Sequence, residues 1–228
     1  MNLLIVSATE KENDALEKKF HLVNPSFEVD FLITGVGMTA SAYALTKKMS
    51  KKKYDLAMNI GLGGTFREEI KIGEVVNVVT DCIADLGAED GEKFLTLSQM
   101  GLLDEDKYPF WNGKLKSEEA GKYVSLSSLK NVKAITVNKV HGHEDSIQRT
   151  IRKFHPDVES MEGAAFYYVS MMERVPCIQL RAISNRVEPR NRESWNIELA
   201  LQNLTQVVSQ FMEEVQELKS SPANGGNK

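Results

Sequence analysis

Two stretches decide the fold of this chain, and each runs off a predicted strand: Val158-Glu159-Ser160-Met161-Glu162-Gly163-Ala164-Ala165 and Arg181-Ala182-Ile183-Ser184-Asn185. Each places polar side chains at the carboxyl end of an otherwise apolar strand. Open α/β sheets bind their ligands at that edge. Together with Glu12 near the start of the chain, these groups predict a site for a ribose diol, a purine edge and a water molecule.

Around these stretches, short apolar runs alternate with helical periodicity. The expected strands are 3–8, 27–33, 56–60, 74–80, 132–140, 158–160 and 176–183. The expected helices are 10–20, 39–49, 145–154, 161–172 and 193–218. The predicted buried stripe of the last helix is Leu199, Leu204, Val208, Phe211 and Val215. This order predicts an α/β layered fold with a mixed, largely parallel sheet, and residues 81–130, which fit neither period, are expected to be irregular.

The composition is that of one ordinary globular domain. Charged residues make up 26% of the 228 residues, and the formal net charge of −4 gives no sign of a nucleic-acid surface. No apolar run approaches the ~18 residues of a membrane span. Cys82 and Cys177 are typical of reduced core thiols in a cytoplasmic protein. The domain is expected to cover residues 1–218, with a disordered tail over 219–228.

Glycines follow the third expected strand as Gly61-Leu62-Gly63-Gly64. They fit a tight turn. They also fit a loop whose backbone N–H groups approach a ligand closely, with Gly63 as the candidate contact. The spacing matches neither a dinucleotide-binding fingerprint nor a phosphate-binding P-loop.

Two glutamates each allow a structural and a functional interpretation. Thr9-Glu10-Lys11-Glu12 matches a capping box, in which Glu12 reaches back to the helix start, but Glu12 also fits a general base at a strand end. Ser160 can cap the next helix, and an acid at Glu162 suits that helix dipole. Alternatively, the Glu162 carboxylate accepts hydrogen bonds from a vicinal diol while Met161 offers the sugar an apolar surface.

Polar residues near the end of the chain are equally ambiguous. Asn185 fits a turn residue that tolerates left-handed backbone, or an amide that reads the N7 and position-6 edge of a purine. Arg186, Arg190 and Arg192 fit a solvated loop or a carboxylate receiver. For His141-Gly142-His143 no third ligand follows at metal-site spacing, which favours a ring stacked on a base over a metal.

Several motifs occur in the order and at about the spacing of a known family: Ala8-Thr9-Glu10-Lys11-Glu12, Asn59-Ile60-Gly61-Leu62-Gly63-Gly64, Ser160-Met161-Glu162 and Arg181-Ala182-Ile183-Ser184-Asn185. On these motifs, residues 1 to 218 resemble the nucleoside phosphorylase and nucleosidase superfamily, in particular its methylthioadenosine/S-adenosylhomocysteine nucleosidase branch. Three segments are more similar to the futalosine hydrolase branch: 85–89, 159–163 and 184–192. The resemblance implies a single-domain, three-layer α/β sandwich and an N-glycosyl hydrolase of the purine nucleosidase type, with no metal or organic cofactor.

The resemblance also implies roles for the candidate residues. Glu12 matches the acid that orients and deprotonates the attacking water. The implied sugar- and base-contacting residues are Met161, Glu162, His141 and Gly142. Asn185 stands where adenosine-type nucleosidases have aspartate, and its amide N–H can donate to O6 or N7 of a 6-oxopurine. This departure favours hypoxanthine over adenine, and futalosine carries hypoxanthine; Arg186, Arg190 or Arg192 would hold its carboxylate.

Three alternatives stay open. One is a phosphorylase of the same fold, which needs an anion pocket, although Arg67 is the first arginine in the chain. The second is a methylthioadenosine-type nucleosidase, which Asn185 disfavours. The third is a nucleoside-binding protein without catalytic activity.

An aromatic segment bears on assembly. Tyr108, Phe110 and Trp111 lie in a polar, irregular stretch, where a monomer gains little from exposing them. They predict a homodimer or higher homo-oligomer, with this segment at or near the interface and the active site. The alternative is a loop folded onto the core of its own chain.

Overall fold

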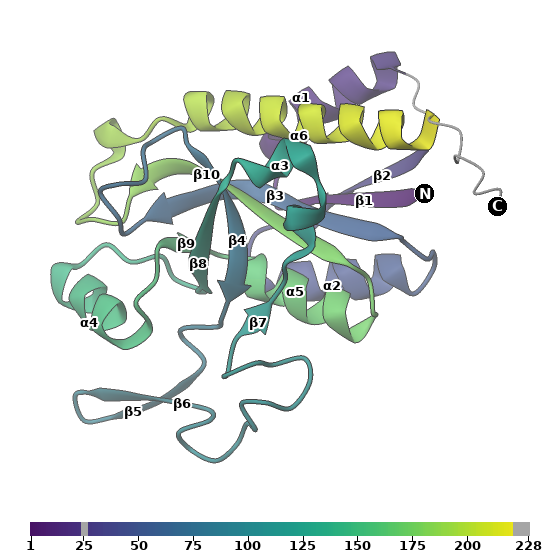
Figure 1. Cartoon of the computed structure of the whole chain (residues 1–228). Helices are drawn as coiled ribbons and strands as arrows, with labels where there is room; N and C mark the ends of the chain where they lie inside the picture. The colour runs from purple at the N-terminus through teal and green to yellow at the C-terminus, as the bar shows by residue number, and fades with distance from the viewer. Residues whose placement is uncertain (24–26, 221–228) are drawn as a thin grey trace.

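A mixed sheet forms the centre of the protein, with helices on both of its faces (Figure 1). The computed structural model describes residues 1–23 and 27–220, so residues 221–228 of the predicted tail lie outside the described residues. The strands of this sheet are β1 (Asn2–Ser7), β2 (Glu28–Ile33), β3 (Leu56–Thr65), β4 (Val75–Asp81), β7 (Leu115–Lys116), β8 (Lys130–Thr136), β9 (Val158–Ser160) and β10 (Cys177–Arg186). A separate hairpin consists of β5 (Gly87–Asp90) and β6 (Lys93–Thr96).

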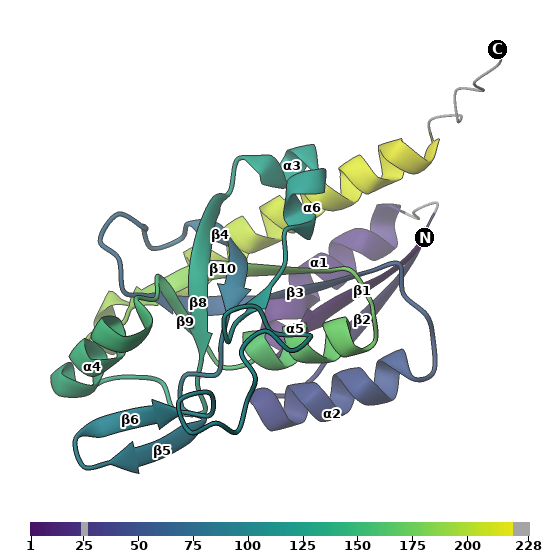
Figure 2. The same cartoon turned by 60° about the horizontal axis from the view of Figure 1, so that its bottom comes forward.

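Two pairs of helices enclose the sheet. On one face lie α1 (Glu10–Val23) and α6 (Ile197–Ser220), and on the other lie α2 (Met38–Met49) and α5 (Gly163–Met172), as Figure 2 shows from a second side. The remaining helical segments are η1 (Glu119–Lys122), α3 (Val124–Ser127), α4 (Glu144–Phe154) and η2 (Arg192–Ser194). The expected three-layer α/β architecture is confirmed. Within the described ranges, no helix is both long enough and apolar enough to cross a membrane.

The sheet curls until part of it closes on itself. Its strand order is β10-β4-β8-β9-β3-β1-β2, and β10 also pairs with β3, so that β3, β9, β8, β4 and β10 form a ring. The parallel pairs are β1–β2, β1–β3, β3–β10, β4–β8 and β8–β9. The antiparallel pairs are β3–β9, β4–β7 and β4–β10. The carboxyl ends of β1, β3 and β10 therefore share one edge, where the motifs of interest lie.

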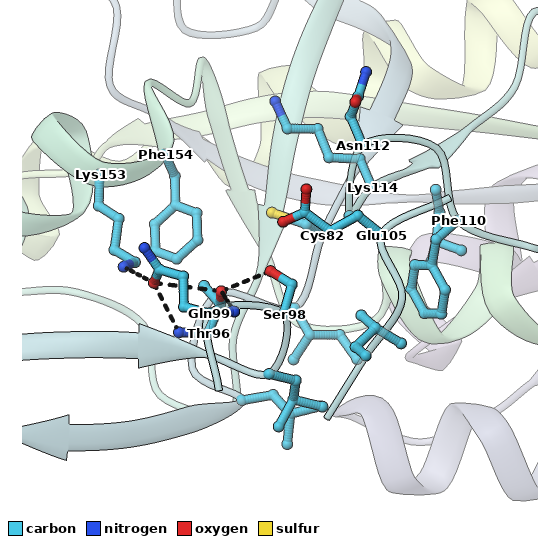
Figure 3. Close-up of a pocket in the computed structure, with 16 residues that line it drawn as sticks. Cys82, Thr96, Ser98, Gln99, Glu105, Phe110, Asn112, Lys114, Lys153 and Phe154 are labelled. Atoms are coloured by element: carbon cyan, nitrogen blue, oxygen red, sulfur yellow. Dashed lines mark hydrogen bonds between the residues drawn. The ribbon is translucent and has the colours of Figure 1, made fainter. Parts of the chain in front are cut away.

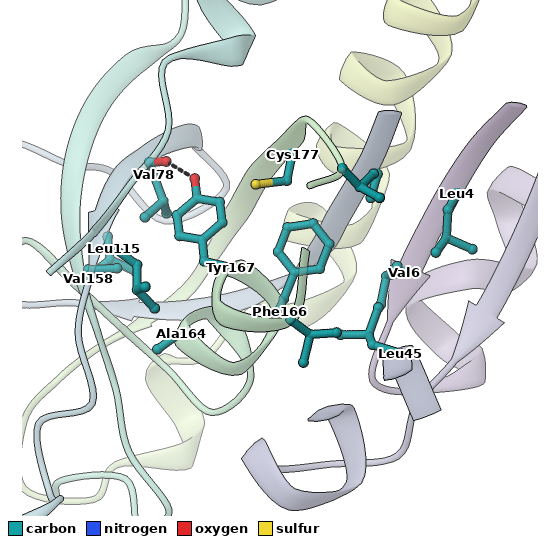
Figure 4. Close-up of a cluster of buried hydrophobic side chains, with 14 of the residues drawn as sticks. Leu4, Val6, Leu45, Val78, Leu115, Val158, Ala164, Phe166, Tyr167 and Cys177 are labelled. Atoms are coloured by element: carbon teal, nitrogen blue, oxygen red, sulfur yellow. Dashed lines mark hydrogen bonds between the residues drawn. The ribbon is translucent and has the colours of Figure 1, made fainter. Parts of the chain in front are cut away.

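In β3 and β10, successive side chains point to opposite faces of the sheet, so these strands contribute to two separate hydrophobic cores. Met58 and Leu180 face the core under α6, whose buried stripe is Ala200, Leu204, Val208, Phe211 and Val215. On the opposite face, α5 contributes Phe166 and Tyr167 to the second core, where the Tyr167 hydroxyl donates to Val78 O at 2.5 Å (Figure 4). The prediction for Leu199 is wrong: its side chain is 37% exposed, because Ala200 occupies that turn of the stripe.

The expected turn at Gly61–Gly64 is wrong, because β3 continues through these glycines to Thr65. There the strand is paired on both sides, with β10 and with β9. A Cβ on Gly63 would lie 2.9 Å from Val158 Cγ1 and 3.2 Å from Glu159 O. The glycine is thus needed for β9 to approach β3, since any side chain would separate the two strands.

Other element boundaries differ by a few residues. Strand β8 ends at Thr136 and not at Val140, since Asn138 N donates to the Asp85 carboxylate at 2.6 Å and turns the chain away. Strand β10 continues past Ile183 through a bulge, so Asn185 is a strand residue and its predicted turn role is wrong. The irregular region 81–130 does contain short elements, among them the β5–β6 hairpin.

The close approach at Gly63 gives a first prediction. Gly63→Ala should lower the free energy of unfolding by ~1–3 kcal/mol, since the methyl group would overpack against Val158 and a backbone oxygen. Gly121→Ala is the control, because a Cβ at Gly121 meets nothing within 4 Å. Urea denaturation of the two variants measures the difference, and equal stabilities would contradict the overpacking.

Candidate active site

Glu12 lies in the first turn of α1, and hydrogen bonds from two segments fix its carboxylate. Its Oε2 accepts from Ala8 N at 3.1 Å, from Thr9 N at 2.9 Å and from Thr9 Oγ1 at 3.1 Å. Its Oε1 accepts from Leu62 N of β3 at 3.1 Å. The bond to Thr9 N is the reciprocal half of the predicted capping box. The bond to Leu62 also places the same carboxylate at the sheet edge, so the two interpretations of Glu12 are compatible.

Glu162 directly precedes α5 and contacts the opposite loop of the site. Its Oε1 accepts from Gly37 N at 2.9 Å, just before α2, where a φ of 94° favours glycine. Burial raises the pKa of Glu162, and the positive charge of Arg181 opposes the rise. The predicted cap by Ser160 is wrong: the helix begins two residues after the expected start, and the buried Ser160 hydroxyl has no hydrogen-bond partner. The half-buried Met161 adjoins Glu162 as expected.

Arg181 is the residue of the site for which the sequence motifs suggested no role. Its side chain is only 1% exposed, and it donates to Asn59 Oδ1 at 2.5 Å and to Leu180 O at 2.9 Å. A Cβ on Gly61 would lie 3.1 Å from Glu12 Oε1 and 3.6 Å from Arg181 Nη1. The glycine thus leaves room for both charged groups. A charge inside an otherwise apolar strand was the signal that could have identified Arg181.

A buried polar network supports the start of α5. Asp81 accepts from Thr136 Oγ1 at 2.9 Å and from Gln179 Nε2 at 3.1 Å. Thr136 Oγ1 in turn accepts from Ala164 N at 2.8 Å, in the first turn of α5. Burial raises the pKa of Asp81 to about 6, against the opposing effect of these hydrogen bonds and of Arg181. The network therefore ties the ends of β4 and β8 to the helix that carries the adjacent Glu162.

Asn185 lies further along β10, beside the glycine segment of β3. Its Oδ1 accepts from Ser184 Oγ at 2.8 Å, and its Nδ2 donates to Arg186 O at 2.8 Å. A Cβ on Gly64 would lie 3.1 Å from Nδ2, so a glycine opposite Asn185 leaves space beside the amide nitrogen. The amide is thus held in one orientation at the edge of the site.

The ring of His141 is held at both of its nitrogens. Nδ1 pairs with the Glu159 carboxylate, and Nε2 lies 2.8 Å from Thr150 Oγ1. The ring also meets Phe66 edge-on, with centroids 6.5 Å apart. Its hydrogen bonds join the loop after β8 to β9 and α4, and its contact with a base stays a prediction. Among residues 1–23 and 27–220, no three His, Cys, Asp or Glu side chains are grouped so as to hold a metal ion.

The candidate arginines have different surroundings. Arg186 donates to Arg67 O and Glu68 O, both at 3.3 Å, which directs its guanidinium to a neighbouring loop. The exposed Arg190 lies over the Trp195 ring at 5.8 Å, and its Cβ is 3.9 Å from where Gly142 would carry a side chain. Arg190 and Gly142 therefore adjoin each other, and a contact of Arg190 or Arg186 with a ligand carboxylate stays a prediction.

A separate cavity of about 310 Å³ lies between the segment that follows β4, the segment 96–115 and the end of α4 (Figure 3). It is lined by residues that include Cys82, Phe110, Lys114, Lys153 and Phe154. In the described part of the chain, none of the candidate catalytic and substrate-binding residues lines it, whereas Phe110 of the aromatic segment does. Burial raises the pKa of the Cys82 thiol to about 12, which keeps it protonated and unreactive at neutral pH. This cavity is distinct from the candidate site.

The ring-closed α/β sheet thus carries two carboxylates at its carboxyl edge and a buried arginine in the middle of β10. The chain belongs to the phosphorylase superfamily, whose family model matches residues 29–218. Within that class it is 30% identical to the futalosine hydrolase of Streptomyces coelicolor, over 92% of this chain and 95% of that protein. It is 24% identical to the 5'-methylthioadenosine/S-adenosylhomocysteine nucleosidase of Desulfotalea psychrophila, over 83% of this chain and 82% of that protein.

Among solved structures, the fold is similar to that of a 5'-methylthioadenosine/S-adenosylhomocysteine nucleosidase from Colwellia psychrerythraea in complex with adenine. The TM-score is 0.77 at 19% identity, and the match covers 95% of this chain and 96% of that one. The expected family is confirmed, and with it an enzyme of the N-glycosyl hydrolase type. The roles expected of Glu12, Glu162 and Asn185 stay predictions.

The burial of Asp81 predicts a pH dependence of stability. An unfolded aspartate loses its proton near pH 4, whereas folded Asp81 keeps it up to about pH 6. Between these values the folded state binds more protons, so Asp81 stabilises the fold at low pH and this contribution is lost as pH rises. The free energy of unfolding of wild type relative to Asp81→Asn should therefore fall between pH 4 and pH 6, by up to ~3 kcal/mol.

Chemical denaturation of both proteins at pH 4, 5, 6 and 7 measures this difference. The asparagine variant has its own pH-independent offset, so only the change with pH bears on Asp81. A constant difference across the series would contradict the raised pKa.

Proposed function

We propose that this protein hydrolyses the N-glycosidic bond of futalosine, releasing hypoxanthine and dehypoxanthinyl futalosine. The observation that carries the proposal is the amide of Asn185, which lies near the end of β10 at the same sheet edge as Glu12 and Glu162 and to which we assign the reading of the base. The identity to a futalosine hydrolase over most of both chains supports this choice. The reaction is a step of menaquinone biosynthesis by the futalosine route, and we propose that it occurs in the cytoplasm, because Cys82 and Cys177 are free thiols.

The mechanism begins with stretching of the glycosidic bond, which gives the ribose an oxocarbenium-like character. Glu162 accepts hydrogen bonds from the 2′ and 3′ hydroxyls and fixes the ring. Asn185 stabilises the charge that develops on the departing base, an effect worth ~3 kcal/mol when the donor is preorganised. Glu12 then takes a proton from the water that attacks the anomeric carbon, a contribution on the order of 10²–10⁴-fold.

The charges around the site favour water over phosphate as the attacking group. The guanidinium of Arg181 faces Glu12, Glu162 and Asp81, so negative groups already surround it. Arg67 is no substitute, because its Nε donates to Asp157 Oδ1 at 2.8 Å, away from the site. A phosphate would meet the carboxylates of Glu12 and Glu162, which disfavours the phosphorylase alternative.

A substrate panel tests the function directly. The protein is incubated with futalosine, aminofutalosine, methylthioadenosine and inosine, each with and without phosphate, and release of the free base is followed. Futalosine should be cleaved fastest, at a rate that phosphate does not change. Equal cleavage of methylthioadenosine would favour the adenosine-type nucleosidase, a requirement for phosphate would favour the phosphorylase, and binding without any cleavage would favour a nucleoside-binding protein.

Glu12→Gln separates catalysis from capping. The variant should lose hydrolysis on the order of 10²–10⁴-fold, because an amide cannot take the proton of water. Its stability should fall by only ~1 kcal/mol, the usual cost of a weakened cap. Glu10→Gln is the matched control, since Glu10 is exposed in the same helical turn. Single-turnover rates measure the first effect and urea denaturation the second, and near-normal turnover would leave Glu12 with the capping role alone.

We propose that the protein forms a homodimer through the face that carries the segment 108–111. Tyr108 is 64% exposed and Trp111 51% exposed, although the Tyr108 hydroxyl donates to Met171 O and fixes the segment on α5. Phe110 is half-buried against Tyr168, so part of the segment does fold onto its own core. Light scattering at micromolar concentration should give twice the monomer mass, and a monomer would refute the assembly.

A further inference from the structure

We propose that the cavity beside the segment 96–115 is a second ligand site, which binds a medium-chain monocarboxylate. The carboxylate would pair with Lys114, and the alkyl chain would lie among the apolar side chains of the wall. The candidate catalytic and substrate-binding residues in the described part of the chain lie outside this cavity. Binding there is therefore independent of the hydrolysis proposed above.

The cavity has the size and the lining of a small-molecule site. Its volume of about 310 Å³ lies at the lower end of the ~300–1,000 Å³ that ligand pockets usually enclose. Figure 3 shows the rings of Phe154 and Phe110 on opposite sides of the view. Both rings keep part of their surface exposed, as do the other apolar side chains of the wall, which include Ile83, Leu86, Leu97 and Leu103. An alkyl chain in the cavity would remove this apolar surface from water, which favours binding.

Lys114 supplies the charge that an anionic ligand needs. Its side chain is half-buried, and among the described residues its ammonium has no hydrogen-bond or ion-pair partner. Burial raises the pKa of the Cys82 thiol, and the ammonium of Lys114 opposes the rise, so its charge acts toward another residue of the same wall. A carboxylate that enters the cavity would accept a charge-assisted hydrogen bond from this ammonium.

The other two charged side chains of the wall do not compete for this role. Lys153 Nζ already donates to Phe94 O at 2.5 Å and to Gln99 Oε1 at 2.8 Å. Glu105 is exposed, so solvent and salt screen its repulsion of an anion. The single ammonium of Lys114 matches the single charge of a carboxylate, whereas a cationic ligand would be repelled by both lysines.

Hydrogen bonds hold the walls in place, so the cavity exists before a ligand enters. Trp111 N donates to Lys114 O at 2.8 Å and Lys114 N donates to Trp111 O at 3.0 Å, which fixes the backbone that carries the ammonium. Lys153 joins α4 to the segment after β6 through its bond to Gln99. Thr136 N donates to the backbone oxygen of Cys82 at 2.8 Å and anchors the third wall to β8. Such a preformed cavity has little ordering entropy to lose on binding.

An NMR titration of the ¹⁵N-labelled protein with octanoate tests the site, and octanamide serves as the uncharged analogue. The amide signals of Cys82, Ile83 and Lys114 should shift, with a dissociation constant for octanoate below about 1 mM. Octanamide should bind at least about 5-fold more weakly, because a hydrogen bond to a charged group is stronger. Each methylene removed from octanoate should weaken binding by about 4-fold. Saturation with hypoxanthine should change none of these constants.

Three variants assign the contacts. Lys114→Met should weaken octanoate at least about 5-fold and leave octanamide unchanged. Lys107→Met is the matched control and should affect neither ligand, since Lys107 is an exposed residue of the same segment that does not line the cavity. Leu103→Trp fills part of the cavity and should weaken both ligands. The ¹⁵N spectrum of each variant shows directly whether it is folded.

Four outcomes would overturn the second site. The first is the absence of shifts at about 10 mM octanoate, a concentration well above the expected dissociation constant. The second is equal affinity for octanoate and octanamide in wild type. The third is an unchanged affinity for octanoate in the folded Lys114→Met variant. The fourth is competition by hypoxanthine, which would place octanoate in the candidate active site instead.

Discussion

The site depends on one buried positive charge. Glu12, Glu162 and Asp81 come from three distant parts of the chain, and three carboxylates this close together would repel one another without a cation among them. Arg181 supplies that cation from the middle of β10, where its guanidinium is fixed by Asn59 and a backbone oxygen. Because a buried charge without partners is very costly, the arginine and the carboxylates require each other.

The backbone around this charge is shaped to let the groups meet. Gly61 leaves room for both Glu12 and Arg181, and Gly63 lets β9 approach closely enough to deliver Glu162. The bulge in β10 then re-aims Ser184 and Asn185, which follow the arginine in sequence. Successive short segments of two paired strands thus perform different tasks: charge balance, strand packing and presentation of an amide.

The layered fold could be predicted from the sequence, because apolar periodicity reports directly which faces are buried. Glu12 and Glu162 could be found as site candidates, since each follows a strand in a motif that resembles a known family. The turn predicted for the glycine segment 61–64 is wrong. Glycine favours turns locally, whereas pairing on both sides of β3 holds this segment in an extended conformation. The exposure of Leu199 depends on where its helix starts, and the contact of Ser184 with Asn185 depends on the bulge in β10. Only tertiary pairing determines these two features.

Ring closure of the sheet has a consequence for the motions of the protein. None of the strands β3, β9, β8, β4 and β10 has a free edge within the ring, so none can detach without breaking hydrogen-bonded ladders on both sides. Local opening should therefore be confined to elements outside it, such as the β5–β6 hairpin and the edge strand β2. Backbone amides beside Arg181 would then exchange with solvent only on global unfolding, while those of the hairpin would exchange in the folded state.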